Sequence, residues 1–145
     1  MFGSMTRNPA GAYATVGLET SINSASPHKL ISMLYDGALT ALAKAAAQMK
    51  AGDIAAKGNS ISQAISIIDN GLRASLNKKQ GGEIAESLDS LYEYMSNRLL
   101  AANIGNHPEY IEEVRTLLKE LKGAWEQIGA PGRAEAGAAS GLQPA

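Results

Sequence analysis

The stretch that decides the fold is SPHKLISMLYDGALTALAKAAAQMKAGD, residues 26–53. It carries the start and stop signals of one long helix. Ser26 suits the N-cap, Pro27 fits the first helical position, and Gly52 suits the left-handed residue that ends a helix. We therefore predict a helix over 27–51, and Asp53 as the N-cap of a helix that follows at once.

Apolar residues recur along this stretch at helical spacing. Further apolar residues flank the core stripe on both sides, so the apolar arc is roughly 240° wide, against the 100° or so that a surface helix needs. The surplus predicts a second partner for this helix. The core stripe consists of Ile31, Leu34, Ala38, Leu42, Ala45 and Met49.

The rest of the chain favours more helices. No proline interrupts residues 28–107, and the chain has only two valines, which argues against strands. We expect helices from 53 to about 77, from 83 to about 103 and from 108 to 129, with turns at 78–82 and 105–106. Short connections make neighbouring helices antiparallel. The prediction is an all-α, antiparallel four-helix bundle over 26–129, preceded by a short N-terminal helical segment (1–25) and followed by a disordered C-terminal tail (130–145).

The second predicted helix has an unusual strip beside its core stripe. Small side chains recur along it, which would let another helix approach the backbone closely. Two interpretations stay open: tight packing within the bundle, or a groove for an external partner. The strip is formed by Ser60, Ala64, Ile67, Gly71 and Ala74.

Composition and charge exclude several classes of protein. Thirteen basic and 14 acidic residues give a net charge of −1, and no basic patch for nucleic acid follows from the sequence. The chain has no cysteine, so disulfides and thiolate metal sites are excluded. The sequence shows neither a secretory signal nor an uninterrupted apolar run of membrane-spanning length, and we expect a cytoplasmic protein without membrane insertion.

Catalytic chemistry is not indicated either. The two histidines, His28 and His107, stand at predicted helix starts without the spacing of a metal-binding pair. Asp36 and Asp69 fall on polar arcs, and the Gly81–Gly82 turn lacks the context of a phosphate loop. We expect no enzyme, no metal and no cofactor.

Several strings resemble the family of flagellin-specific export chaperones, FliS. They are collinear across about 12–128 and comprise AYA (12–14) with Val16, SASPHKLI (24–31), MLYDGA (33–38), IIDNGL (67–72), GGEIA (81–85), and LY with YM (91–95). The resemblance implies a four-helix bundle that binds the C-terminal helical region of newly made flagellin in the cytoplasm. Binding would prevent premature polymerisation, and the loaded chaperone would be handed to the flagellar export gate.

The resemblance and the helix faces together nominate client-binding residues. For Ile61 and Ile68, a place in the core is the favoured alternative. We expect Gly71→Leu to weaken client binding with little loss of bundle stability, and the protein without client to self-associate weakly or to be partly blocked by its N-terminus. The nominated residues are Leu30, Met33, Tyr35, Leu39, Ile61, Ala64, Ile67, Ile68 and Gly71, with Tyr13 and Val16 in the N-terminal cap.

A second interpretation comes from another class of protein. The extra apolar stripe could be the interface of a constitutive scaffolding oligomer, since oligomers use such stripes often. That alternative predicts a symmetric dimer or tetramer that survives dilution, whereas a chaperone forms a hetero-complex with a helical client segment.

Overall fold

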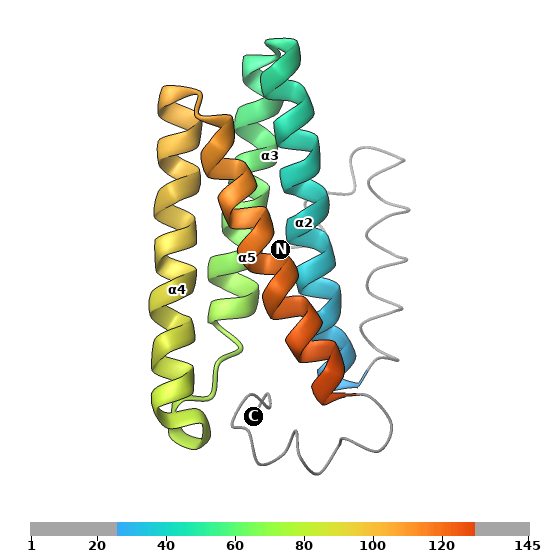
Figure 1. The fold of residues 1–145 in the computed structure, drawn as a ribbon, viewed down its shortest axis with the longest axis vertical. Coiled ribbons are helices and arrows are strands. Elements are labelled where there is room, and N and C mark those ends of the chain that lie inside the picture. The colour runs from blue at the N-terminus through green and yellow to red at the C-terminus, as the bar shows by residue number, and fades with distance from the viewer. Residues whose placement is uncertain (1–25, 130–145) are drawn as a thin grey trace, which may run out of the picture.

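A computed structural model describes residues 26–129, where four helical segments pack as an antiparallel bundle (Figure 1). The helices are α2 (Pro27–Ala51), α3 (Ile54–Ser66), α4 (Lys78–Gly105) and α5 (Pro108–Ile128), and α3 continues directly into a π-helical turn, η2 (Ile67–Arg73). The predicted all-α four-helix bundle is confirmed for this range. The predicted N-terminal segment, its residues Tyr13 and Val16, and the predicted tail lie outside the described residues.

Local capping chemistry sets the ends of α2 and the start of α3, as predicted. The Ser26 side chain accepts a hydrogen bond from the backbone N–H of Lys29 at 3.1 Å. Gly52 ends α2 with φ 77°, and the Asp53 carboxylate accepts from the N–H of Ala56 at 3.2 Å. Each cap satisfies backbone groups that a helix end leaves without partners.

The structure differs from the prediction after Ser66. Regular α-helix stops there, the π-helical turn runs to Arg73, and the chain then turns before Lys78 rather than after it. Residues 78–81 form one helical turn, because the Asn77 side chain accepts from the N–H of Gln80 at 3.1 Å. Gly82 interrupts the helix with φ 54° and ψ −127°.

Aliphatic side chains from all four helices fill the core, among them Leu42, Ile61, Met95 and Leu118. One polar pair lies among them. The hydroxyls of Tyr35 and Tyr92 are 2.7 Å apart and buried. Burial raises the pKa of both phenols, so both stay neutral and share one hydrogen bond.

At each end of the bundle, a polar side chain of one helix is hydrogen-bonded to another helix. At one end, the Trp125 indole N–H donates to the carbonyl of His28 at 2.9 Å, and the two rings stack with centroids 4.7 Å apart. At the other, the buried Lys57 donates from Nζ to the carbonyl of Asn103 at 3.0 Å and to Asn106 Oδ1 at 2.7 Å. Lys57 thus caps the C-terminal end of α4 from α3.

By length and composition alone, α2 could cross a membrane. The core helix of a bundle passes the same test, and α2 packs here against α3, η2 and α5. Packing within the bundle therefore accounts for part of its apolar character.

Gly82 has a backbone conformation that a residue with a Cβ adopts only under strain. We expect Gly82→Ala to destabilise the protein by about 1–3 kcal/mol, measured by urea unfolding. The control is Gly123→Ala, a helical position on α5 where a Cβ would meet no atom within 4 Å. That change should be neutral or stabilising by up to about 1 kcal/mol; equal effects at both glycines would contradict the assignment of strain to Gly82.

Candidate functional site

The contact between α2 and η2 is a close approach of two helices that depends on glycine. A Cβ on Gly71 would lie 2.9 Å from Leu34 Cδ2, and one on Gly37 would lie 3.4 Å from Ile67 Cδ1. The missing side chain of Gly71 therefore lets Leu34 rest against its backbone. Tight packing within the bundle, one of the two open interpretations, explains Gly71.

An apolar surface follows this contact along the outside of the bundle. On α2 its residues are spaced three or four apart, so they share one face of the helix. All of its members are partly buried, with part of each residue open to solvent. We call this surface the α2–η2 seam; it comprises Leu30, Met33, Leu34, Gly37, Ile67 and Gly71.

Four of the nominated client-binding residues lie inside the core. Tyr35 is 4% exposed and hydrogen-bonded to Tyr92, and Ile61, Ala64 and Ile68 have no exposed surface. The core alternative stated for Ile61 and Ile68 matches their positions. In the described structure these four side chains support the seam from behind, and a partner would have to open the bundle to touch them.

Leu39 is separated from the other nominated residues. It follows Leu30 by nine residues, which is two and a half helical turns, so the two side chains project from opposite sides of α2. Leu39 packs against the core cluster from its own side. The structure brings together only Leu30, Met33, Ile67 and Gly71 of the nominated set.

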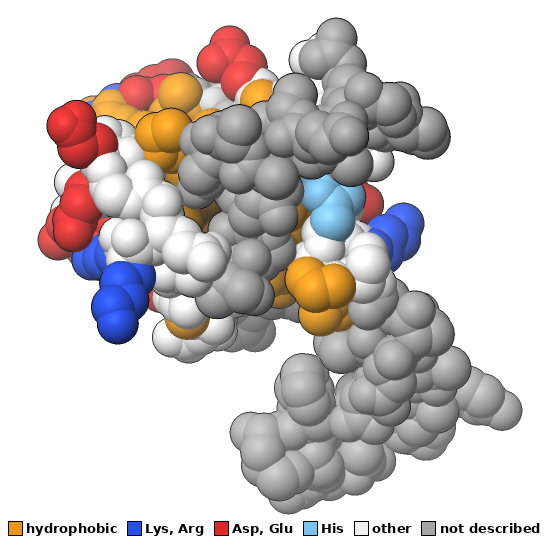
Figure 2. All heavy atoms as spheres, turned by 90° about the horizontal axis from the view of Figure 1, so that it is seen from below, with side chains coloured by type: hydrophobic (Ala, Val, Ile, Leu, Met, Phe, Trp, Pro, Cys, Tyr) orange, Lys and Arg blue, Asp and Glu red, His pale blue; other side chains and the backbone are white. Residues whose placement is uncertain are grey.

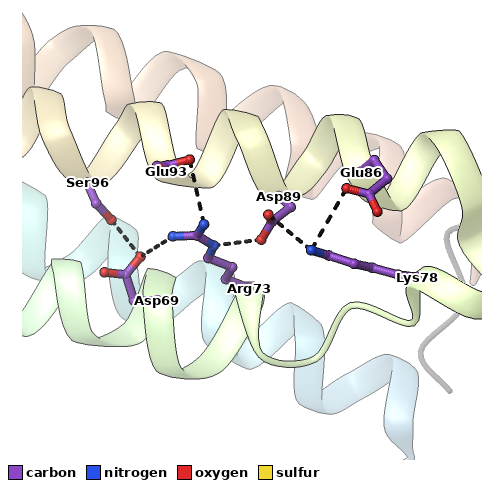
Figure 3. A network of polar contacts seen from close by, with 7 residues as sticks. All are labelled: Asp69, Arg73, Lys78, Glu86, Asp89, Glu93 and Ser96. Atoms are coloured by element: carbon purple, nitrogen blue, oxygen red, sulfur yellow. Dashed lines mark hydrogen bonds and ion pairs between the residues drawn. The ribbon is translucent and has the colours of Figure 1, made fainter.

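A polar network fixes the other side of η2 to α4, as Figure 3 shows. Arg73 Nε donates to Asp89 Oδ1 at 2.6 Å, and Lys78 Nζ lies 3.2 Å from Asp89 Oδ2. Asp69 accepts from the Ser96 hydroxyl at 2.9 Å. The hydrogen bond from Arg73, with a smaller contribution from Lys78, lowers the pKa of Asp89.

Sequence reasoning missed this network, because its members are 11 to 27 residues apart and no helical spacing links them. The available signal was the pair Asp69 and Arg73, which stand four apart and are 3.9 Å from each other. Such a pair on a helix face is ordinarily solvated. In the structure, Arg73 bonds to Asp89 of α4 and Asp69 bonds to Ser96 of α4.

Other apolar side chains also reach the surface of the described range. An open pocket of about 290 Å³ is lined by residues of α4: Glu83, Ile84, Ser87, Leu88 and Leu91. Figure 2, which views the bundle from the lower end in Figure 1, shows apolar side chains at the surface between charged ones. Away from the pocket, Ile54 and Ile104 are 71% and 86% exposed.

Residues 26–129 contain no group of three or more histidine or carboxylate side chains that could hold a metal ion. Some of their charged side chains form ion pairs between helices, such as Lys122 with Asp36 at 2.6 Å and Arg98 with Glu113 at 2.8 Å. The described site is therefore an apolar contact surface with a polar support behind it.

Comparison with known proteins decides the family. The family described as "Flagellar protein FliS" matches residues 9–132. The chain belongs to the FliS family. It is 53% identical over 117 residues to the flagellar secretion chaperone FliS of Salmonella typhimurium, an alignment that covers 81% of this chain and 87% of that protein.

Other FliS proteins match over nearly the same extent. The flagellar secretion chaperone FliS of Escherichia coli is 43% identical over 116 residues, covering 80% of this chain and 85% of that protein. That of Bacillus subtilis is 33% identical over 121 residues, covering 83% and 86%. The family resemblance inferred from the sequence strings is thereby confirmed.

Gly71→Leu tests the closest contact of the seam. The expectation that this change leaves bundle stability nearly intact does not fit the position of Leu34. We now expect overpacking to cost about 1–3 kcal/mol in urea unfolding. Adding Leu34→Ala, which removes the clashing methyl groups, should make the double variant lose less than the sum of the two single losses; strict additivity would show that the two residues do not press on each other.

Asp89→Asn tests the polar support. Because the folded-state pKa of Asp89 is lowered, its ion pairs stabilise the fold above the unfolded-state pKa near 3.9 and are lost as pH falls through the lower folded value. The variant should be less stable than the wild type at pH 7, and the gap should narrow below about pH 4. Glu83→Gln, on the same helix and exposed, is the control; a gap independent of pH would refute the electrostatic account.

Proposed function

We propose that this protein binds the C-terminal helical region of flagellin in the cytoplasm, prevents its premature polymerisation and delivers it to the flagellar export apparatus. The observation that carries the proposal is the partly exposed apolar α2–η2 seam in a chain of the FliS family. The relatives are named flagellar secretion chaperones, which supports a binding role without catalysis.

The seam suits an amphipathic helix as its partner. Helix-in-groove recognition uses apolar anchors spaced three or four residues apart, and on α2 Met33 and Leu34 follow Leu30 at that spacing. A client segment that folds only on binding loses conformational entropy, so it needs a continuous apolar surface to reach useful affinity. Ile67 and Gly71 extend the surface onto the neighbouring helix.

We assign Leu30, Met33, Ile67 and Gly71 as client contacts, and retain Tyr13 and Val16 as a cap that covers apolar surface when no client is bound. Tyr35, Leu39, Ile61, Ala64 and Ile68 act indirectly in this proposal, by holding α2 and α3 in place. Weak self-association of the client-free protein follows from the same exposed surface.

The direct test is calorimetric titration of the full chain with a peptide from the last forty or so residues of flagellin from the same organism, with circular dichroism alongside. We expect one-to-one binding, a gain in helicity and a negative heat-capacity change. A folded sample that binds no peptide would refute the proposal, and a symmetric oligomer that survives dilution would favour the scaffolding alternative.

Met33→Asp locates the client site. A charge placed in a desolvated apolar contact should weaken binding at least about tenfold while leaving the fold intact, because Met33 is only partly buried. Ala124→Asp, at an exposed position on α5, is the matched control and should bind within about twofold of the wild type. Equal affinities for both variants would remove the seam from the binding site.

A further inference from the structure

The π-helical turn η2 is the least ordinary part of the backbone. π-Helices are rare, occur mostly as single turns, and are frequent at functional sites. Here seven residues, Ile67–Arg73, adopt this form in the middle of a helix that begins as a regular α-helix at Ile54. Contacts outside the helix must therefore favour the π form over the more common α form.

Those contacts differ on the two sides of η2. Towards α4 they are polar and directional, from Arg73 to Asp89 and from Ser96 to Asp69 (Figure 3). Towards α2 they are apolar contacts at glycines, with no hydrogen bond or ion pair between α2 and η2 in the described range. Separating these surfaces breaks no directional hydrogen bond, so the cost is that of the lost apolar contacts alone.

Gly71 faces Leu34 only while the segment Ile67–Arg73 is π-helical. A π-helix uses more residues per turn than an α-helix, so rewinding η2 as α-helix brings an earlier residue to the same angular position. The place facing Leu34 would pass from Gly71 to Asn70, whose side chain is exposed in the π form. The Asn70 Cβ would then press on Leu34, and α2 and η2 would have to separate.

The same rewinding would weaken the contact with α4, because Leu72 would replace Arg73 opposite Asp89. We propose that Ile67–Arg73 is a two-state segment. In the free protein the segment is π-helical and the seam is closed, with Leu34 packed against Gly71. When a partner helix binds, the segment is α-helical and the seam is open, with α2 and η2 separated. This inference rests on the proposed function, because it names the motion by which the same seam would admit its client.

Deletion of Asn70 tests the inference. With one residue fewer, a regular α-helix places Gly71 opposite Leu34 and keeps Arg73 opposite Asp89, so the closed seam no longer needs the π form. We expect a folded variant whose amides over 67–75 exchange at least about tenfold more slowly than in the wild type. Its affinity for the flagellin peptide should fall at least about tenfold, because the seam has lost its route to opening. Asn70→Ala keeps the chain length and should match the wild type in both measurements.

Wild-type hydrogen exchange supplies a measurement that needs neither the variant nor the client. The amides of Ile68 and Leu72 are in buried residues, as are those of Leu42 and Leu99. If η2 converts between two windings, its amides should exchange faster than the other two; equal rates would overturn the inference, whether or not the deletion variant folds.

A deletion variant that binds the peptide as tightly as the wild type would also overturn it. Failure of the wild type to bind would refute the proposed function alone.

Discussion

The structure depends on the direct contact between α2 and the backbone of η2 at Gly71. Leu34 occupies the space that a side chain would fill, and Gly37 receives Ile67 one helical turn further along. These contacts bring the two helices close enough to bury Ile61, Ala64 and Ile68 behind them. They also leave Leu30 and Met33 at the edge of the contact, where each stays partly open to solvent. Packing and the proposed client contacts thus use adjacent residues of one surface.

The position of α2 explains most of its wide apolar arc. This helix packs on α3 and η2 along one side and on α5 along the other (Figure 1). The surplus that the sequence suggested for a second partner is therefore largely used within the bundle, with Leu39 as one example. What remains for an external helix is the narrower strip that includes Leu30 and Met33.

The fold could be predicted because its signals are local. Ser26, Gly52 and Asp53 cap helices through residues three or four positions away, so sequence order alone places them. The site was harder to predict, because its faces were placed by assuming that every helix rotates by 100° per residue along its whole length. The π-helical turn breaks that assumption after Ser66. Tyr35 was misleading for a different reason: its partner, Tyr92, is 57 residues away, and only the tertiary structure shows that the hydroxyl can be buried.

We propose above all that the α2–η2 seam receives the flagellin segment. Chemical-shift mapping of the isotope-labelled full chain with unlabelled flagellin peptide tests it most directly. We expect the largest shifts to fall on Leu30, Met33, Ile67 and Gly71. Shifts concentrated on α4 and α5, with the seam unchanged in a saturated complex, would contradict it.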